Sequence, residues 1–158
     1  MKKGIIATIT AISGITAGVT LTGKVMKKEI EKNRSMSDKH LTLFIMMSKW
    51  VELKQKGKCL KSYFEDKNYK KIAIYGMSYV GERLVEELKN SNVEIAYGID
   101  KNASGIYTDI NTITPEENLE KVDAIIVTPV FFFDEIEEEL SKKIDCPIIS
   151  LEDILYEM

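Results

Sequence analysis

The sequence predicts an α/β domain with a parallel five-stranded sheet, preceded by a transmembrane helix and an amphipathic helical connector. From residue 71 onward, short apolar runs alternate with helical patterns, which is typical of strands joined by crossover connections. A turn with two glycines follows the first apolar run. Near the start of the chain lies an uncharged stretch. These observations divide the chain into an anchor (1–23), a basic connector (24–70) and the α/β domain (71–158).

The composition excludes several classes of protein. With 158 residues, 44% hydrophobic and 30% charged, the chain is neither collagen-like, disulfide-dense nor wholly disordered. Its two cysteines, Cys59 and Cys146, are far apart and show no CxxC spacing. His40 is the only histidine, which argues against a histidine-rich metal site and a Ser-His-Asp triad.

Charge is distributed unevenly along the chain. Residues 24–70 hold 13 Lys and Arg against 6 Asp and Glu. Residues 71–158 hold 7 Lys and Arg against 19 Asp and Glu, a net charge of −12. A domain with that charge repels a phosphate backbone, so we expect no nucleic acid among its partners.

The uncharged stretch, residues 4–23, is long enough to cross a bilayer as a helix. A cleaved signal peptide is the alternative. The length of the run and the lack of an A-x-A site before Lys24 favour an uncleaved anchor in membrane lipid. More basic residues follow the run than precede it, which predicts a single-pass protein of the cell membrane with its C-terminal domain in the cytoplasm. The flanking basic residues are Lys24, Lys27, Lys28, Lys32 and Arg34, against Lys2 and Lys3 before the run.

In the connector, the pattern predicts a helix over residues 39–56, with an N-cap at Ser37 and Asp38 and a stop at Gly57. Its apolar arc is wider than one half-buried face requires. The helix therefore either packs only on the following domain or also contacts a second copy of the chain or another protein. A shorter helix is expected over 59–66.

The domain itself is expected to contain five strands and the connections between them. Strands of a parallel sheet that is buried on both faces read as continuous apolar runs. Such runs predict strands at 72–75, 93–99, 110–113, 122–128 and 147–151, and helical patterns predict helices after the glycine turn, after Thr114, over 133–143 and over 152–156. With Pro115 at its first position and Glu117 placed for a capping box, the helix after Thr114 has a complete start signal.

Alternating elements of this kind follow the Rossmann plan, with strand order 3-2-1-4-5. In such sheets ligands bind beyond the carboxyl ends of the strands, where the order reverses. That edge carries residues 76–81, 100–102 and 128–130. The candidate nucleotide-binding residues are Gly76, Met77, Ser78, Tyr79, Gly81, Asp100, Lys101, Thr128 and Pro129.

The glycine turn reads G-x-S-x-x-G, one residue short of the dinucleotide fingerprint G-x-G-x-x-G. Gly76 permits the tight turn, Gly81 permits close packing of helix on strand, and Ser78 replaces the glycine that approaches a pyrophosphate. Asp100, 24 residues after Gly76, is placed to accept ribose hydroxyls. The structural alternative is that both glycines serve turn geometry alone and Asp100 caps a loop.

Two other features are interpreted as structural. Phe131, Phe132 and Phe133 lie near the ligand edge, but core packing is the simpler explanation. Tyr63 and Lys67 have the Y-x-x-x-K spacing of short-chain dehydrogenases, yet they precede the glycine turn, whereas in those enzymes the pair follows it.

The stretch "KIAIYGMSYVGERLVEEL…VEIAYGIDKNASGIYTDINTITPEENL…VDAIIVTP" resembles the Rossmann-like modules of bacterial cell-surface polysaccharide biosynthesis proteins. These modules stand at the start of sugar acyltransferases and beside membrane-bound nucleotide-sugar epimerases and dehydratases. The resemblance covers about residues 70–155 and implies that Gly76, Ser78, Gly81 and Asp100 contact a nucleotide or nucleotide sugar. It also implies that a protein partner of the helix at 39–56 would be a polysaccharide-biosynthesis protein. The chain carries neither hexapeptide repeats for acyl transfer nor a complete epimerase domain.

Together these patterns favour a membrane-anchored cytoplasmic module that binds a nucleotide or nucleotide sugar, for example a UDP-sugar, and assists surface-polysaccharide assembly without catalysis of its own. One alternative is a small NAD-dependent oxidoreductase or redox sensor, for which Asp100 favours NAD over NADP. Another is a non-catalytic interaction module with a degenerate Rossmann fold.

Overall fold

A computed structural model describes residues 32–106 and 108–158. The chain divides into two compact units, residues 1–42 and 43–158. In the first unit the described residues, 32–42, are helical. The anchor predicted at 4–23 lies outside the described residues. Within the described ranges, no helix is both long and apolar enough to cross a membrane.

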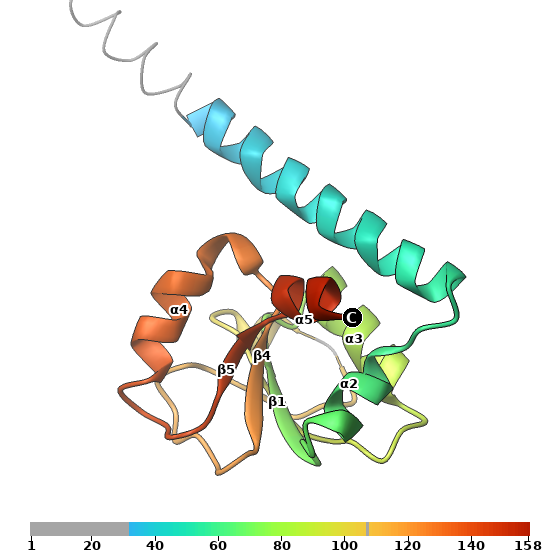
Figure 1. Ribbon diagram of the computed structural model, residues 1–158. Coiled ribbons are helices and arrows are strands. Elements are labelled where there is room, and N and C mark those ends of the chain that lie inside the picture. The colour runs from blue at the N-terminus through green and yellow to red at the C-terminus, as the bar shows by residue number, and fades with distance from the viewer. Residues whose placement is uncertain (1–31, 107) are drawn as a thin grey trace, which may run out of the picture. The chain divides into compact units, whose positions relative to one another are not determined.

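The second unit is built on a parallel sheet whose observed strand order, β3-β2-β1-β4-β5, confirms the predicted order (Figure 1). β1 is the central strand and pairs with β2 on one side and β4 on the other. The strands are β1 (Lys71–Tyr75), β2 (Glu94–Ile99), β3 (Thr112–Ile113), β4 (Ala124–Val127) and β5 (Ile148–Ser150).

Helices cover the two faces of this sheet unequally. The first face packs against α2 (Leu60–Asp66), α3 (Tyr79–Leu88), α5 (Leu151–Glu157) and one side of the helical segment 43–55. Among the described helices, only α4 (Phe133–Leu140) covers the second face. β4 is buried along its whole length, as expected for a strand covered on both faces.

The connection from β3 to β4 differs from the prediction, because residues 114–123 between these strands form no helix. One of the two hydrogen bonds of the predicted capping box is present: the Thr114 N–H donates to Glu117 Oε1 (2.7 Å). Contacts to other elements instead hold this segment in a non-helical conformation. Tyr97 Oη donates to the Glu120 carbonyl (2.7 Å) and Lys143 Nζ donates to the Pro115 carbonyl (2.7 Å). The strand expected at 110–113 is shorter, since only Thr112 and Ile113 pair.

The connector helix also differs from its expected bounds. Residues 32–55 are helical, so the N-cap predicted at Ser37 and Asp38 is wrong. Instead, the Asp38 carbonyl accepts a hydrogen bond from Thr42 Oγ1 (3.0 Å) within the helix. The stop at Gly57 is confirmed, because this residue has a φ of +73° and follows the last helical turn.

Candidate functional site

At the carboxyl edge of the sheet, the glycine turn is fixed by direct contact with the loop after β4. Gly76 has a φ of +90°. A Cβ there would lie 2.6 Å from both Thr128 Oγ1 and Pro129 Cδ, so the position has no room for a side chain. Buried Thr128 donates from Oγ1 to the Gly76 carbonyl (2.6 Å). The structure therefore brings Gly76, Thr128 and Pro129 together, as the sequence predicted.

The same turn sets the start of α3. A Cβ on Gly81 would overlap the Gly76 carbonyl oxygen, so only glycine lets the first turn of the helix pack this closely. Ser78 is the N-cap residue, is exposed, and makes no side-chain capping hydrogen bond in the described structure. The first N–H groups of α3 thus lack the acceptor that an N-cap hydroxyl usually supplies, and such groups attract anions.

Asp100 follows β2 and organises the loops around it. Its Oδ2 accepts a hydrogen bond from the Met77 N–H (3.0 Å), and its Oδ1 accepts one from the Asn102 N–H (2.9 Å). The structural role considered for Asp100 is therefore present. A carboxylate has about four acceptor positions, so two remain for other donors. Asp100 is half-buried and the next residue, Lys101, is exposed.

Met77 occupies a different position from the other residues of the turn. Its side chain is buried. It lies against β2, where a Cβ on Gly98 would come within 2.6 Å of Met77 Cγ. The side chain of Met77 therefore belongs to the core, and its N–H is the group that donates to Asp100.

Three exposed aromatic side chains flank this edge. Tyr79, in the first turn of α3, is 85% exposed, and Phe131 and Phe132 are 44% and 39% exposed. The two phenylalanines form an edge-to-face pair with ring centroids 5.6 Å apart. The expectation of core packing is thus wrong for Phe131 and Phe132. They lie in the 3-10 turn η2 (Val130–Phe132), which precedes α4, and only Phe133 packs against the core.

Tyr75, the last residue of β1, lies in the strand that was predicted to be buried, but the state of its hydroxyl was not predicted. Its hydroxyl is buried and has no hydrogen-bond partner in the described part of the chain. Burial raises the pKa of Tyr75 to about 12, and the charges of Glu139, Asp100 and Glu116 add to the rise. The phenol therefore stays neutral at physiological pH. Within an apolar strand, a single tyrosine gives no sequence signal that its hydroxyl will be unpaired.

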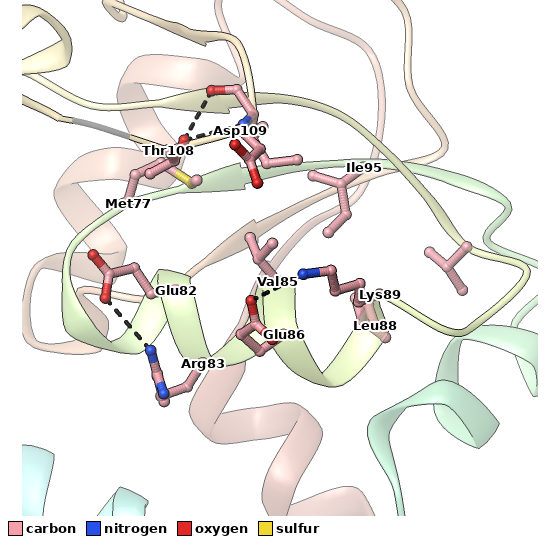
Figure 2. A pocket seen from close by; sticks show the side chains of 12 residues that line it. Met77, Glu82, Arg83, Val85, Glu86, Leu88, Lys89, Ile95, Thr108 and Asp109 are labelled. Carbon is pink, nitrogen blue, oxygen red and sulfur yellow. Dashed lines mark hydrogen bonds and ion pairs between the residues drawn. The ribbon is translucent and has the colours of Figure 1, made fainter.

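A pocket of about 750 Å³ lies beside α3, on the flank of the sheet that β2 forms (Figure 2). Apolar side chains line much of it, including Val85, Leu88 and Ile95. Two ion pairs of α3 and its C-cap residue Lys89 lie at the rim: Arg83 with Glu82 (3.6 Å) and Lys89 with Glu86 (3.6 Å). The opposite rim carries Thr108 and Asp109. Because Met77 and Glu82 also line it, the pocket begins next to the glycine turn.

Elsewhere, the Y-x-x-x-K pair has structural partners. Lys67 Nζ donates to Glu157 Oε1 (2.6 Å), and this contact raises the pKa of Lys67. Tyr63 is buried, and burial raises its pKa to about 12. Both residues belong to α2 or its C-cap, before β1, which agrees with the interpretation that the spacing is a coincidence.

Among the described residues, no group of Asp, Glu, His and Cys could hold a metal ion.

The fold and the glycine turn define a Rossmann-like α/β domain, and comparison with protein families assigns it more narrowly. The family described as C2185-like, N-terminal, matches residues 68–148, about half of the chain. The chain therefore belongs to the family of C2185-like N-terminal domains. Neither the curated proteins nor the solved structures gave a match.

Proposed function

We propose that this chain is a membrane-anchored module that binds a nucleotide or nucleotide sugar and serves as an accessory protein in surface-polysaccharide assembly. The observation that best supports a bound ligand is the N-terminus of α3, which has no side-chain cap in the described structure. Gly76 and Gly81 admit no side chain, and exposed Ser78 leaves the first N–H groups without a side-chain acceptor in the described structure. This arrangement suits a phosphate group.

The remaining features of the edge match the other parts of a nucleotide. Asp100 retains acceptor positions for ribose hydroxyls, beyond the two that its backbone partners use. Exposed Tyr79 and Phe131 offer aromatic faces on which a base or a sugar ring can stack. Because the β1 and β4 loops are joined through Thr128 and Gly76, these groups are held at one edge rather than on independent loops.

The membrane and pathway parts of the proposal have other support. The anchor rests on the uncharged run at 4–23 and the basic residues after it. The link to polysaccharide assembly rests on the resemblance of residues 70–155 to modules of that pathway. The binding role without catalysis rests on the same resemblance, because the chain carries neither the hexapeptide repeats nor the complete epimerase domain that accompany such modules.

The test is a calorimetric titration of the full chain in lipid nanodiscs with UDP-glucose, UDP-N-acetylglucosamine and NAD⁺. We expect a UDP-sugar to bind and Ser78→Asp to weaken that binding by about tenfold or more, since a like charge at the phosphate position costs at least about 1.4 kcal/mol. Aspartate is a good N-cap residue, so this variant keeps α3 intact.

Asn92→Asp is the matched control, because it adds the same charge at an exposed position beyond the other end of α3. It should leave the affinity unchanged. Binding of NAD⁺ alone would replace the UDP-sugar proposal with the dinucleotide alternative. A folded chain that binds none of the three compounds would refute the ligand assignment.

A further inference from the structure

The pocket between α3 and β2 extends from the glycine turn along the flank of the sheet. Its volume of about 750 Å³ falls within the range of small-molecule sites, roughly 300–1,000 Å³. Met77 and Glu82 line it next to the turn, and Leu88 and Lys89 line it at the C-terminal end of α3 (Figure 2). The pocket is therefore continuous with the proposed phosphate position at the start of α3.

This flank is open because the crossover from β2 to β3 has little regular structure. In a doubly covered parallel sheet, a helix normally packs over the crossover between adjacent strands. Here the crossover contains only the 3-10 turn η1 (Ala103–Gly105) within the described part of the chain. Val85, Leu88 and Ile95 consequently form an apolar floor, and polar groups are confined to the rim.

Asp109 is the charged group of this rim that remains available to a ligand. The other charged residues of the rim are joined in the two ion pairs described above, and Thr108 Oγ1 donates to the Ile110 carbonyl (2.9 Å). The Asp109 carboxylate is exposed and has no hydrogen-bond or ion-pair partner in the described part of the chain. It lies across the pocket from α3 (Figure 2).

The pairing of β3 shows which part of a ligand would reach Asp109. Thr112 pairs with Gly98, so Asp109, three residues before Thr112, lies below the carboxyl edge of the sheet. Asp100, in contrast, directly follows β2 and lies at the edge itself. A nucleotide with its phosphate at the start of α3 and its ribose at Asp100 would reach Asp109 only with a group at one end of the molecule.

We propose that this end group is a neutral sugar, so that the domain binds a nucleotide sugar with its sugar in the α3–β2 pocket and sugar hydroxyls bonded to Asp109. The inference rests on the proposed nucleotide site, and it specifies which part of the ligand enters the pocket. A plain nucleotide would leave the pocket empty.

The lining of the pocket favours a sugar over a base. A sugar ring combines apolar C–H groups, which suit the floor, with several hydroxyl donors, which suit a carboxylate that only accepts hydrogen bonds. A base is usually held by stacking on an aromatic side chain. No aromatic residue is found among the described residues that line the pocket, whereas Tyr79 and Phe131 are exposed outside it.

The charge of the rim favours a neutral sugar over a uronic acid. Among the described lining residues are three acids, Glu82, Glu86 and Asp109, and two bases, Arg83 and Lys89. Because the bases are paired with the two glutamates, a carboxylate on the sugar would meet the unpaired charge of Asp109. Repulsion between like charges at such short range weakens binding.

Calorimetry of the full chain in lipid nanodiscs, with UDP, UDP-glucose and UDP-glucuronate, tests the inference. We expect Asp109→Ala to weaken UDP-glucose binding about tenfold, since hydrogen bonds to a charged group are lost. The same variant should not weaken UDP binding. On charge alone, removing an acid tightens the binding of any anionic ligand, so a loss confined to UDP-glucose identifies a contact with the sugar.

A second variant tests the charge preference. Wild type should bind UDP-glucose about tenfold more tightly than UDP-glucuronate, and Asp109→Asn should reduce this ratio to about threefold or less. Asp145→Asn is the matched control, because it removes an exposed acid that does not line the pocket. It should leave both the UDP-glucose affinity and the ratio unchanged.

The outcomes separate this inference from the nucleotide proposal. If Asp109→Ala binds UDP and UDP-glucose as wild type does, or if Asp109→Asn leaves the ratio unchanged, the sugar does not lie in the pocket, while the nucleotide proposal stands. Equal effects of Asp109→Asn and Asp145→Asn would also overturn the inference. If wild type binds none of the three compounds, both proposals fail.

Discussion

At the scale of single residues, the carboxyl edge depends on contacts between positions far apart in the sequence. Thr128 and Gly76 are separated by 52 residues, yet the hydroxyl of one bonds the carbonyl of the other. This bond joins the loop after β4 to the glycine turn. Gly81 then packs the first turn of α3 against the same carbonyl. A change at any of these positions should disturb the whole edge.

We expect Gly81→Ala to lower the free energy of unfolding by about 2 to 3 kcal/mol, because its Cβ would overlap the Gly76 carbonyl in a packed region. Urea unfolding of the full chain, followed by the fluorescence of Trp50, measures the change. Gly57→Ala is the control: unlike Gly81, this residue has a positive φ, but nothing lies within 4 Å of the added Cβ. It should cost only the left-handed penalty of about 1 kcal/mol. Equal costs for the two variants would contradict this account of Gly81.

Tyr79→Ala should weaken UDP-sugar binding without affecting stability. The side chain is 85% exposed, so its loss should change the free energy of unfolding by less than about 0.5 kcal/mol. Loss of a stacking face should cost about 1 kcal/mol or more of binding free energy. Calorimetry on Tyr79→Ala and on Tyr156→Ala, another exposed tyrosine, separates the two effects. Identical affinities for both variants would remove Tyr79 from the site.

Part of this site could be predicted from the sequence. Gly76, Gly81 and Asp100 have fixed spacings in a known structural context, so their positions at the edge follow from the pattern alone. The burial of the Met77 side chain and the exposure of Phe131 depend on neighbours from other strands and turns. The local sequence does not show which residues those neighbours are. For that reason the aromatic pair was misjudged as core.

At the scale of elements, Glu87 of α3 holds the helical segment 43–55 and α2 against the sheet. Its carboxylate accepts hydrogen bonds from Trp50 Nε1 (2.7 Å) and the Leu60 N–H (2.8 Å), and pairs with Lys54 (3.1 Å). Only 9% of the Glu87 side chain is exposed. Three elements therefore meet at one carboxylate.

Glu87→Ala should destabilise the chain by about 2 to 3 kcal/mol, because two part-buried donors lose their acceptor. It should also shift Trp50 fluorescence to the red, as the indole loses its polar partner and water reaches it. Glu86→Ala, one residue away and exposed, should change stability by no more than about 0.5 kcal/mol. A Trp50 spectrum that stays unchanged in Glu87→Ala would contradict this role.

Asp123 joins the amino ends of β1 and β4 in a pH-dependent way. Hydrogen bonds from the Lys71 and Lys70 N–H groups lower the pKa of Asp123 below 3.8. A depressed pKa contributes stability that is present above the unfolded-state value and is lost as pH falls through the folded-state value. The stability difference between wild type and Asp123→Asn should therefore be largest above about pH 5 and shrink toward about pH 2. Urea midpoints measured across this range test it, and a constant difference would contradict it.

The elements themselves were largely predictable. β1 and β4 are continuous apolar runs, and α3 repeats its apolar residues at helical spacing. The helix expected after Thr114 does not form, although its start signal in the sequence is complete. Contacts from Tyr97 and Lys143 hold that segment in a non-helical conformation. These partners come from β2 and the end of α4, so a local pattern cannot include them.

At the scale of the whole molecule, an acidic Rossmann-like domain presents a helix N-terminus that has no side-chain cap in the described structure. A domain with a net charge of −12 disfavours anions in general, so an anionic ligand must be recognised locally by directed N–H groups.

The most direct measurement is hydrogen–deuterium exchange of the full chain with and without UDP-glucose, resolved to single amides by mass spectrometry. The first amides of α3, at Tyr79, Val80 and Gly81, precede the first intrahelical bond, which the Glu82 N–H makes to the Ser78 carbonyl. We predict that UDP-glucose slows exchange at these three amides, and that Ser78→Asp abolishes the slowing by the ligand. Unchanged exchange at all three, under conditions where calorimetry detects binding, would place the ligand elsewhere and contradict the account.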